Sequence, residues 1–142
     1  MLKLHHEDTL KYYVNKYKIL DIFKIDFTKN MELHCFCKDE FIICEYTSPN
    51  YLYFLVEGKI NKINSPINSN VIGALEIFTD SNFNYNLKAI DDCICIGIPR
   101  FIVENIAFEN INFLKYFCRL FSSEIHENNS SENFFKKEKD AI

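Results

Sequence analysis

The feature that most constrains this chain is a series of short apolar segments in its central half. Seven of them follow one another between residues 31 and 98, and no segment of helical length separates them. Parallel strands need long crossover connections, usually helices, so a βαβ sheet is excluded. Short, closely spaced strands bounded by turn residues are typical of a sandwich, a barrel or a jelly roll. The predicted strands cover residues 31–37, 41–46, 51–56, 59–63, 71–77, 84–90 and 93–98.

Helical periodicity flanks this β region on both sides. The stripe of a first helix, over residues 8–22, consists of Leu10, Tyr13, Val14 and Tyr17, and Asp8 or Thr9 is its expected N-cap. Helical sequence resumes at Pro99 and continues to about Asn128. We therefore divide the chain into an N-terminal helical segment (1–30), a β-roll (31–99), two C-terminal helices (100–130) and a charged tail (131–142).

The last helix carries two apolar stripes. The first consists of Ile111, Leu114, Cys118, Phe121 and Ile125, whose spacing of 3, 4, 3 and 4 is that of a coiled coil. The second consists of Phe113, Phe117 and Leu120. One stripe suffices to dock a helix on its own domain, so the coiled-coil stripe predicts a homodimer interface. The alternative is a single wide stripe that the β core covers entirely.

Composition excludes several classes of protein. The 142 residues suffice for one domain, and 16 basic against 20 acidic residues give a net charge of −4, which disfavours nucleic-acid binding by this segment itself. No run of about 18 apolar residues occurs, and the start lacks the apolar region of a secretory signal. We therefore expect a cytoplasmic protein without membrane contact, whose six cysteines are thiols.

Several segments together resemble the sensor domain of the Crp/Fnr family of bacterial regulators. Residues 41–46 and 51–60 match its opening hairpin, 71–78 the start of its nucleotide cassette, and 87–98 the strand pair that follows. The helix after Pro99 and the one from about Asn110 match its hinge and dimerisation helices. The resemblance extends over residues 8–130.

This resemblance implies a mainly β fold with flanking helices: a double-stranded β-helix, or jelly roll, with an N-terminal helix and a long C-terminal dimerisation helix. In the family, that helix leads into a helix-turn-helix domain that reads DNA. Here the chain stops where that domain would start, so we expect DNA contact only through a helix-turn-helix domain missing from this chain. Whether the chain is a trimmed sensor half or naturally lacks the reader stays open. A small-molecule effector of unknown identity is the further expected partner.

The cassette departs from the family where a cyclic nucleotide would bind. Family members hold the phosphate with an arginine and the ribose with a glutamate directly after the cassette glycine. Here Ala74 follows Gly73, the arginine position falls near Phe83, and no arginine occurs between Ile63 and Pro99. A buried phosphate without a cation is strongly disfavoured, so we predict that cAMP and cGMP do not bind specifically. The remaining effector pocket, for a neutral or apolar ligand or filled by its own side chains, comprises Gly73, Ala74, Leu75, Glu76, Phe83, Asn84 and Tyr85.

The cysteines divide into two groups. Cys35, Cys37 and Cys44 are candidates for a redox or metal role, whereas Cys93, Cys95 and Cys118 are interpreted as small buried apolar residues. Cys-x₂-Cys turns and the N-terminal cysteine cluster of iron–sulfur sensors do not occur in the sequence, so we predict no metal site and no cofactor.

Catalysis has no basis in the sequence. The four histidines do not form the His-x-His pattern of a jelly-roll metalloenzyme, and there is no phosphate-binding glycine loop. We therefore expect a protein that is not an enzyme but the sensor and dimerisation domain of a Crp/Fnr-type transcription regulator. The alternatives are a degenerate, non-sensing dimerisation module and a jelly-roll metal or redox binder.

Overall fold

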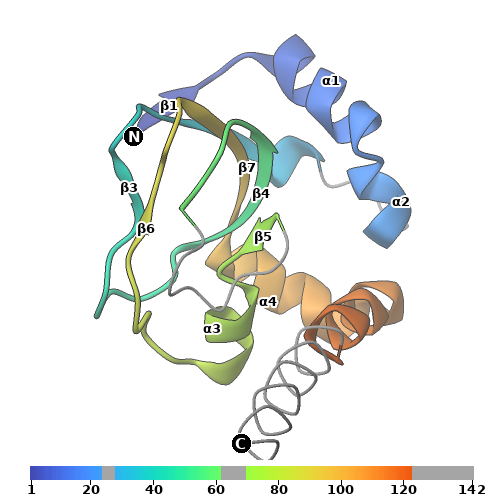
Figure 1. Ribbon diagram of the computed structural model, residues 1–142. Coiled ribbons are helices and arrows are strands. Elements are labelled where there is room, and N and C mark those ends of the chain that lie inside the picture. The colour runs from blue at the N-terminus through green and yellow to red at the C-terminus, as the bar shows by residue number, and fades with distance from the viewer. Residues whose placement is uncertain (24–27, 62–69, 123–142) are drawn as a thin grey trace, which may run out of the picture.

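The computed structural model describes residues 1–23, 28–61 and 70–122, which form a β-roll with helices on one side (Figure 1). A five-stranded sheet of order β1-β2-β7-β4-β5 lies opposite a two-stranded sheet, β3-β6, and the paired strands are antiparallel. The strands are β1 (Leu2–Leu4), β2 (Glu32–Phe36), β3 (Phe41–Ile43), β4 (Tyr51–Glu57), β5 (Val71–Ile72), β6 (Leu87–Lys88) and β7 (Cys93–Pro99). The helices are α1 (Glu7–Lys16), α2 (Ile19–Phe23), a 3₁₀ turn η1 (Thr28–Asn30), α3 (Ala74–Thr79) and α4 (Arg100–Glu109), and residues 111–122 are also helical.

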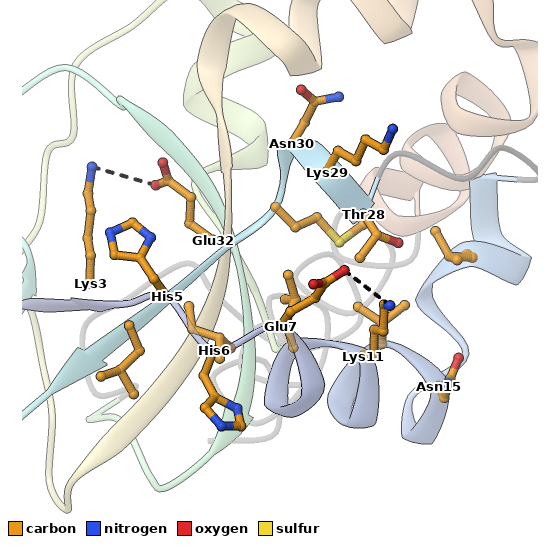
Figure 2. A pocket seen from close by; sticks show the side chains of 16 residues that line it. Lys3, His5, His6, Glu7, Lys11, Asn15, Thr28, Lys29, Asn30 and Glu32 are labelled. Carbon is orange, nitrogen blue, oxygen red and sulfur yellow. Dashed lines mark ion pairs between the residues drawn. The ribbon is translucent and has the colours of Figure 1, made fainter.

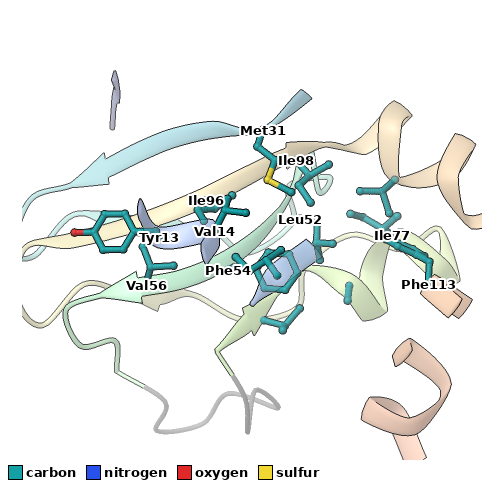
Figure 3. Close-up of a cluster of buried hydrophobic side chains, with 14 of the residues drawn as sticks. Tyr13, Val14, Met31, Leu52, Phe54, Val56, Ile77, Ile96, Ile98 and Phe113 are labelled. Atoms are coloured by element: carbon teal, nitrogen blue, oxygen red, sulfur yellow. The ribbon is translucent and has the colours of Figure 1, made fainter. Parts of the chain in front are cut away.

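The central strands β4 and β7 are buried on both faces. Successive side chains of a strand point to opposite faces, and here each face packs into a core of its own. The helix-side core takes Leu52, Phe54 and Val56 of β4, and Figure 3 shows them with Ile96 and Ile98 of β7. The inner core, between the two sheets, takes from these strands Tyr53, Leu55, Cys93 and Cys95.

Helices close the helix-side core. The buried face of α1 consists of Leu10, Tyr13 and Val14, as its periodicity predicts, while Tyr17 is exposed and donates its hydroxyl to the carbonyl of Val56 at 2.8 Å. Phe113 and Phe117 complete this core from the C-terminal helical segment. The prediction of a mainly β fold with flanking helices is therefore confirmed.

The N-terminal helix differs from its prediction in two respects, an internal break and the identity of its N-cap. Residues 8–22 form two helices because Lys18 adopts a left-handed conformation, with φ 52°, between α1 and α2. The N-cap is His6 rather than Asp8 or Thr9: its Nδ1 accepts the backbone N–H of Thr9 at 3.1 Å. A histidine ring nitrogen thus satisfies an amide that Ser, Thr, Asp or Asn more often caps.

Four strand predictions are wrong in extent or type. The segment 41–46 is a strand only over β3, because the chain turns after Cys44. The segment 71–77 is a strand only over β5, because the chain turns at Gly73 into α3. Of the segment 84–90, only β6 is a strand. In the segment 59–63, Ile60 forms an isolated bridge with Ala89, and residues 62 and 63 lie outside the described residues. Strand β1, which pairs with β2 from Leu2 to Leu4, was not predicted.

The C-terminal helical region contains a break. Helix α4 ends at Glu109, and Asn110 is extended, with φ −124° and ψ 105°. Its side-chain oxygen accepts the backbone N–H groups of Asn112 and Phe113 at 3.0 and 3.3 Å, which caps the next helical segment. Residues 111–122 follow, whereas Ile125, the helix end near Asn128 and the predicted tail 131–142 lie outside the described residues.

Burial of Phe113 provides a direct test of this architecture. Phe113→Ala should lower the free energy of unfolding by about 3–5 kcal/mol, because the ring is fully buried among other rings. Phe101→Ala, in which the ring is 64% exposed on α4, is the matched control and should change it by less than about 0.5 kcal/mol. Urea denaturation followed by circular dichroism measures both, and equal losses would contradict the arrangement.

Candidate effector site

The candidate effector site begins where β5 turns into α3. Gly73 has φ +91°, a conformation that L side chains rarely adopt, and it acts as the N-cap of α3. A Cβ at this position would lie 3.0 Å from the carbonyl oxygen of Tyr51 and 3.8 Å from Cζ of Phe83. The glycine therefore lets the chain pass close to β4 and brings α3 over one end of the roll (Figure 1).

The ring of Phe83 fills the space beside Gly73. Its backbone N–H donates to the carbonyl of Thr47 at 2.9 Å, and its carbonyl accepts from the N–H of Tyr46 at 2.7 Å. The side chain is buried in the inner core, and its ring meets that of Tyr85 edge-on at 5.8 Å between centroids. An apolar ring therefore lies at the position where the resemblance places an arginine.

Glu76 places a carboxyl group inside the same region. Its side chain is 6% exposed, and burial raises its pKa, while a hydrogen bond from the Tyr85 hydroxyl opposes that shift. Burial disfavours the charged form of an acid. In neither protonation state does this group supply the positive charge that a buried phosphate needs.

Five of the seven predicted pocket residues come together in the fold. Ala74, Glu76, Phe83 and Tyr85 are buried beside Gly73, whereas Leu75 is exposed on α3 and Asn84 is exposed between its two buried aromatic neighbours. The ammonium of Lys88 sits over the Phe41 ring, 5.5 Å from its centroid, on an exposed side chain.

Arg100 joins the far end of α3 to α4. Its guanidinium lies 2.6 Å from a carboxylate oxygen of Asp80 and 2.8 Å from one of Glu104. Phe78 of α3 provides a second connection, because its ring packs against those of Phe113, Phe117 and Phe121 at centroid distances of 6.2, 5.3 and 6.0 Å. Helix α3 is thus fixed to the C-terminal helices at two points.

The predicted dimer stripe lies mostly on the outside of the described chain. Ile111 is 64% exposed, Leu114 is 39% exposed and Cys118 is exposed. Phe121 is half-buried and contacts the rings of Phe78 and Phe117, so it contributes to both faces of the helix. The second predicted stripe packs on the domain, because Phe113 and Phe117 are buried there and Leu120 packs against the helix-side core.

A buried polar network, which the sequence analysis did not identify, links β1, β2 and β4. His34 is fully buried: its Nδ1 lies 2.7 Å from the Tyr53 hydroxyl and its Nε2 lies 2.8 Å from a carboxylate oxygen of Glu32. Burial lowers the pKa of His34, and the Glu32 carboxylate opposes that shift. With Nε2–H donating to Glu32, Nδ1 accepts from Tyr53, so a neutral imidazole satisfies both partners.

Gly97 makes room for this network. It is the register partner of Glu32 on β2 and of Tyr53 on β4, and a Cβ there would lie 3.1 Å from the Tyr53 ring and 3.4 Å from that of His34. A histidine at an inward position of β2 and a glycine in β7 are the two signals that could have identified it. The strand register that joins them is not readable from one sequence.

The cysteines occupy three environments. All six are free thiols: Cys93 and Cys95 are buried as predicted, Cys35 is half-buried, and Cys37 and Cys44 are exposed. The prediction for Cys118 as a buried apolar residue is wrong, because this thiol lies on the outer face of residues 111–122. Burial raises the pKa of Cys35, Cys93 and Cys95, which lowers their thiolate fraction and hence their reactivity.

The described residues lack two further features. Three or more His, Cys, Asp or Glu side chains placed to share a metal ion do not occur among residues 1–23, 28–61 and 70–122. Within the same ranges, every helix is too short or too polar to cross a lipid bilayer.

Comparison with solved structures identifies the fold. The chain superposes on the CBD2 domain of PKAR bound to Sp-2Cl-cAMPS (TM-score 0.60, 16% identity, 86% of this chain and 92% of that one). It also superposes on the sensor domain of the transcriptional regulator DNR from Pseudomonas aeruginosa (TM-score 0.61, 14% identity, 84% and 92%). No protein-family model and no curated protein sequence matches the chain.

A third neighbour is the regulatory subunit of a cAMP-independent protein kinase A from Trypanosoma brucei (TM-score 0.52, 13% identity, 80% of this chain). The chain spans 51% of its length. That structure is a triple mutant bound to cAMP in its A site, and one of its substitutions replaces a threonine with an arginine. The neighbours are cyclic-nucleotide-binding domains and include a Crp/Fnr-type sensor domain, so the β-roll fold that the resemblance implied is confirmed. The long C-terminal dimerisation helix stays a prediction.

Burial of Glu76 predicts a pH-dependent effect of its replacement. Because its pKa is raised in the fold, the folded chain holds this proton better than the unfolded chain, and stability falls as pH rises past the ordinary glutamate range. Glu76→Gln should therefore stabilise the protein at pH 7, and the gain should vanish by about pH 4.

The control for this prediction is Glu109→Gln, which removes the same charge from an exposed position. Thermal unfolding between pH 4 and pH 8 measures both variants. A gain for Glu76→Gln that is independent of pH, or equal to that of Glu109→Gln, would show that its carboxyl is not buried.

Proposed function

We propose that this chain is a sensor-type regulatory domain that pairs with a second copy of itself and does not bind cAMP or cGMP. The observation that carries this proposal is the ring of Phe83, which occupies the space next to Gly73 where the resemblance requires an arginine. The fold is that of proteins that control other domains, and catalysis has no support among the described residues.

Electrostatics supports the exclusion of cyclic nucleotides. A phosphate taken from water into a half-buried site needs a cation, best supplied as a bidentate arginine. Around Gly73 the chain instead offers an apolar ring and the carboxyl of Glu76, whose ionised form would repel the ligand. The trypanosomal neighbour gives a precedent for a cAMP-independent member of this fold, and its cAMP-bound mutant contains a new arginine.

Two surfaces of one helix support the pairing. Phe113 and Phe117 are already buried against the domain, so Ile111, Leu114 and Cys118 remain as an apolar face that needs a separate cover. The same helix of a second copy could cover this face, because apolar residues spaced alternately three and four positions apart pack against the same pattern in a coiled coil. In a complete regulator this pair would orient a DNA-reading domain, as the neighbour that is a transcriptional regulator suggests.

The filled space beside Gly73 also favours the second candidate function, a dimer platform without an effector at this site. Both functions share the fold and the paired helix, and they differ in whether the region of α3 responds to any ligand.

Ligand binding tests the exclusion of cyclic nucleotides. In isothermal titration calorimetry, cAMP and cGMP should give no saturable heat at millimolar concentration with the wild-type chain, because no cation meets the phosphate. The double variant Ala74→Glu with Phe83→Arg should gain saturable cAMP binding, because the glutamate would bind the ribose and the arginine would bind the phosphate. Phe83→Ala is the control that opens the space without a cation, and it should stay silent. Micromolar binding of either nucleotide to the wild-type chain would refute the proposal.

Association of the chain tests the pairing. Sedimentation equilibrium should give a dimer for the wild-type chain, and Leu114→Asp should shift it to a monomer because a charge would enter an apolar seam. Phe101→Asp changes an exposed apolar residue outside the stripe and should leave the dimer intact. A wild-type monomer at high concentration, or equal effects of both substitutions, would overturn the pairing.

A further inference from the structure

A short strand forms one edge of the five-stranded sheet. Among the described strands β1 pairs with β2 alone, and its three residues are all exposed. Leu2 and Leu4 are 63% and 39% exposed, so they bury little apolar surface. Elements with few buried contacts open at a low cost in free energy. Polar side-chain contacts therefore carry much of the attachment of β1.

Lys3 makes the central contacts of this attachment. Its ammonium donates to the Tyr51 hydroxyl at 2.9 Å and lies 3.7 Å from a carboxylate oxygen of Glu32, an ion pair that Figure 2 shows. The same ammonium lies over the Tyr51 ring, 5.4 Å from its centroid. Lys3 is also the register partner of His34, so both side chains lie on one face of the sheet. The attachment of β1 thus borders the buried network around His34.

Lys3 and His34 share one acceptor. The Glu32 oxygen that Lys3 approaches, Oε2, also accepts from Nε2 of His34 at 2.8 Å. With a neutral imidazole, the ammonium and the carboxylate balance each other, and Nδ1 accepts from the Tyr53 hydroxyl at 2.7 Å. A proton on Nδ1 would change both arrangements, because two cations would then share one carboxylate and the Tyr53 hydroxyl would lose its acceptor.

The other titratable groups near the imidazole do not supply a second negative charge. They are the Met1 amino group on β1, which pairs with Glu40, the Tyr51 and Tyr53 hydroxyls on β4, and the Cys95 thiol on β7. Burial raises the pKa of Tyr53 and of Cys95, which keeps both groups uncharged at neutral pH. The charges of Lys3 and of the Met1 amine both act to lower the pKa of His34.

We propose that His34 is a proton sensor that controls the attachment of β1: protonation of its imidazole favours a state in which β1 has left the edge of β2. His34 is fully buried while β1 is in place, and release of the strand would admit water to its ring. Burial lowers the pKa of His34 in spite of the Glu32 carboxylate, so a hydrated imidazole binds the proton more strongly. Acid therefore shifts the population toward the open state.

The pH range of the release separates His34 from Glu32. The ordinary pKa of histidine is about 6.5 and that of glutamate about 4.3. The pKa of both groups is lowered in the fold. The attachment of β1 should therefore be strongest above about pH 6.5 and weaken below it, while Glu32 is still charged.

This inference is independent of the proposed function. It involves β1, β2, β4 and β7, whereas the proposed function rests on Phe83 and on residues 111–122. Failure of the pH response would therefore leave the arguments about cyclic nucleotides and pairing unchanged.

Amide hydrogen exchange of the full chain between pH 7.5 and pH 5.0 tests the release. It is measured by NMR from the millisecond range upward and corrected for the intrinsic pH dependence of exchange. Protection of the amides paired between β1 and β2 should fall by at least about fivefold, whereas that of the β4–β7 ladder should stay constant. The ring nitrogens of His34, followed by ¹⁵N NMR, should show a neutral imidazole with its proton on Nε2 at pH 7.5. Constant protection of β1, an equal fall in both ladders, or an imidazolium at pH 7.5 would overturn the proposal.

Two variants assign the response to one histidine. His34→Gln retains a donor and an acceptor but cannot be protonated, so protection of β1 should be the same at pH 5.0 and pH 7.5. His5→Gln removes an exposed histidine next to β1 and should keep the wild-type fall. Circular dichroism verifies that the variants fold, and the wild-type profile with the His34 tautomer decides the matter if His34→Gln does not. A wild-type fall in His34→Gln, or its loss in His5→Gln, would refute the assignment to His34.

Discussion

Burial of β4 and β7 on both faces is the constraint on which the rest of the structure depends. Two adjacent strands whose alternate side chains enter two different cores fix the position of everything on either side of them. On the inner side they set the depth of the roll and the place of Phe83. On the outer side they supply the apolar surface on which α1 and residues 111–122 pack.

The sequence predicted the β-rich middle, the flanking helices and the two stripes of the last helix, because these depend on local periodicity. It failed where tertiary context overrides local preference. The run after Val71 alternates too weakly to be distinguished from a short buried helix, and only the left-handed glycine at 73 indicates the turn into α3. Strand β1 has just three residues, and it forms because β2 offers an edge far along the chain.

The sequence predicted those parts of the candidate site whose residues are adjacent along the chain. Ala74 beside Gly73, and the absence of arginine near Phe83, follow from the residues once the resemblance to the sensor family is accepted. The position of the Phe83 ring beside Gly73 could not be predicted from the sequence, because its burial depends on backbone hydrogen bonds to Thr47 and Tyr46. The network around His34 joins three strands, so it depends on a register that composition and spacing do not encode.

Phe78 connects α3 to residues 111–122. Its backbone belongs to α3, yet its ring is packed among three rings of residues 111–122, and Arg100 binds Asp80, the C-cap at the same end of this short helix. A close-packed aromatic cluster transmits displacement instead of absorbing it, because its interior has little free volume. A displacement of the C-terminal end of α3 would therefore be passed through this cluster to residues 111–122.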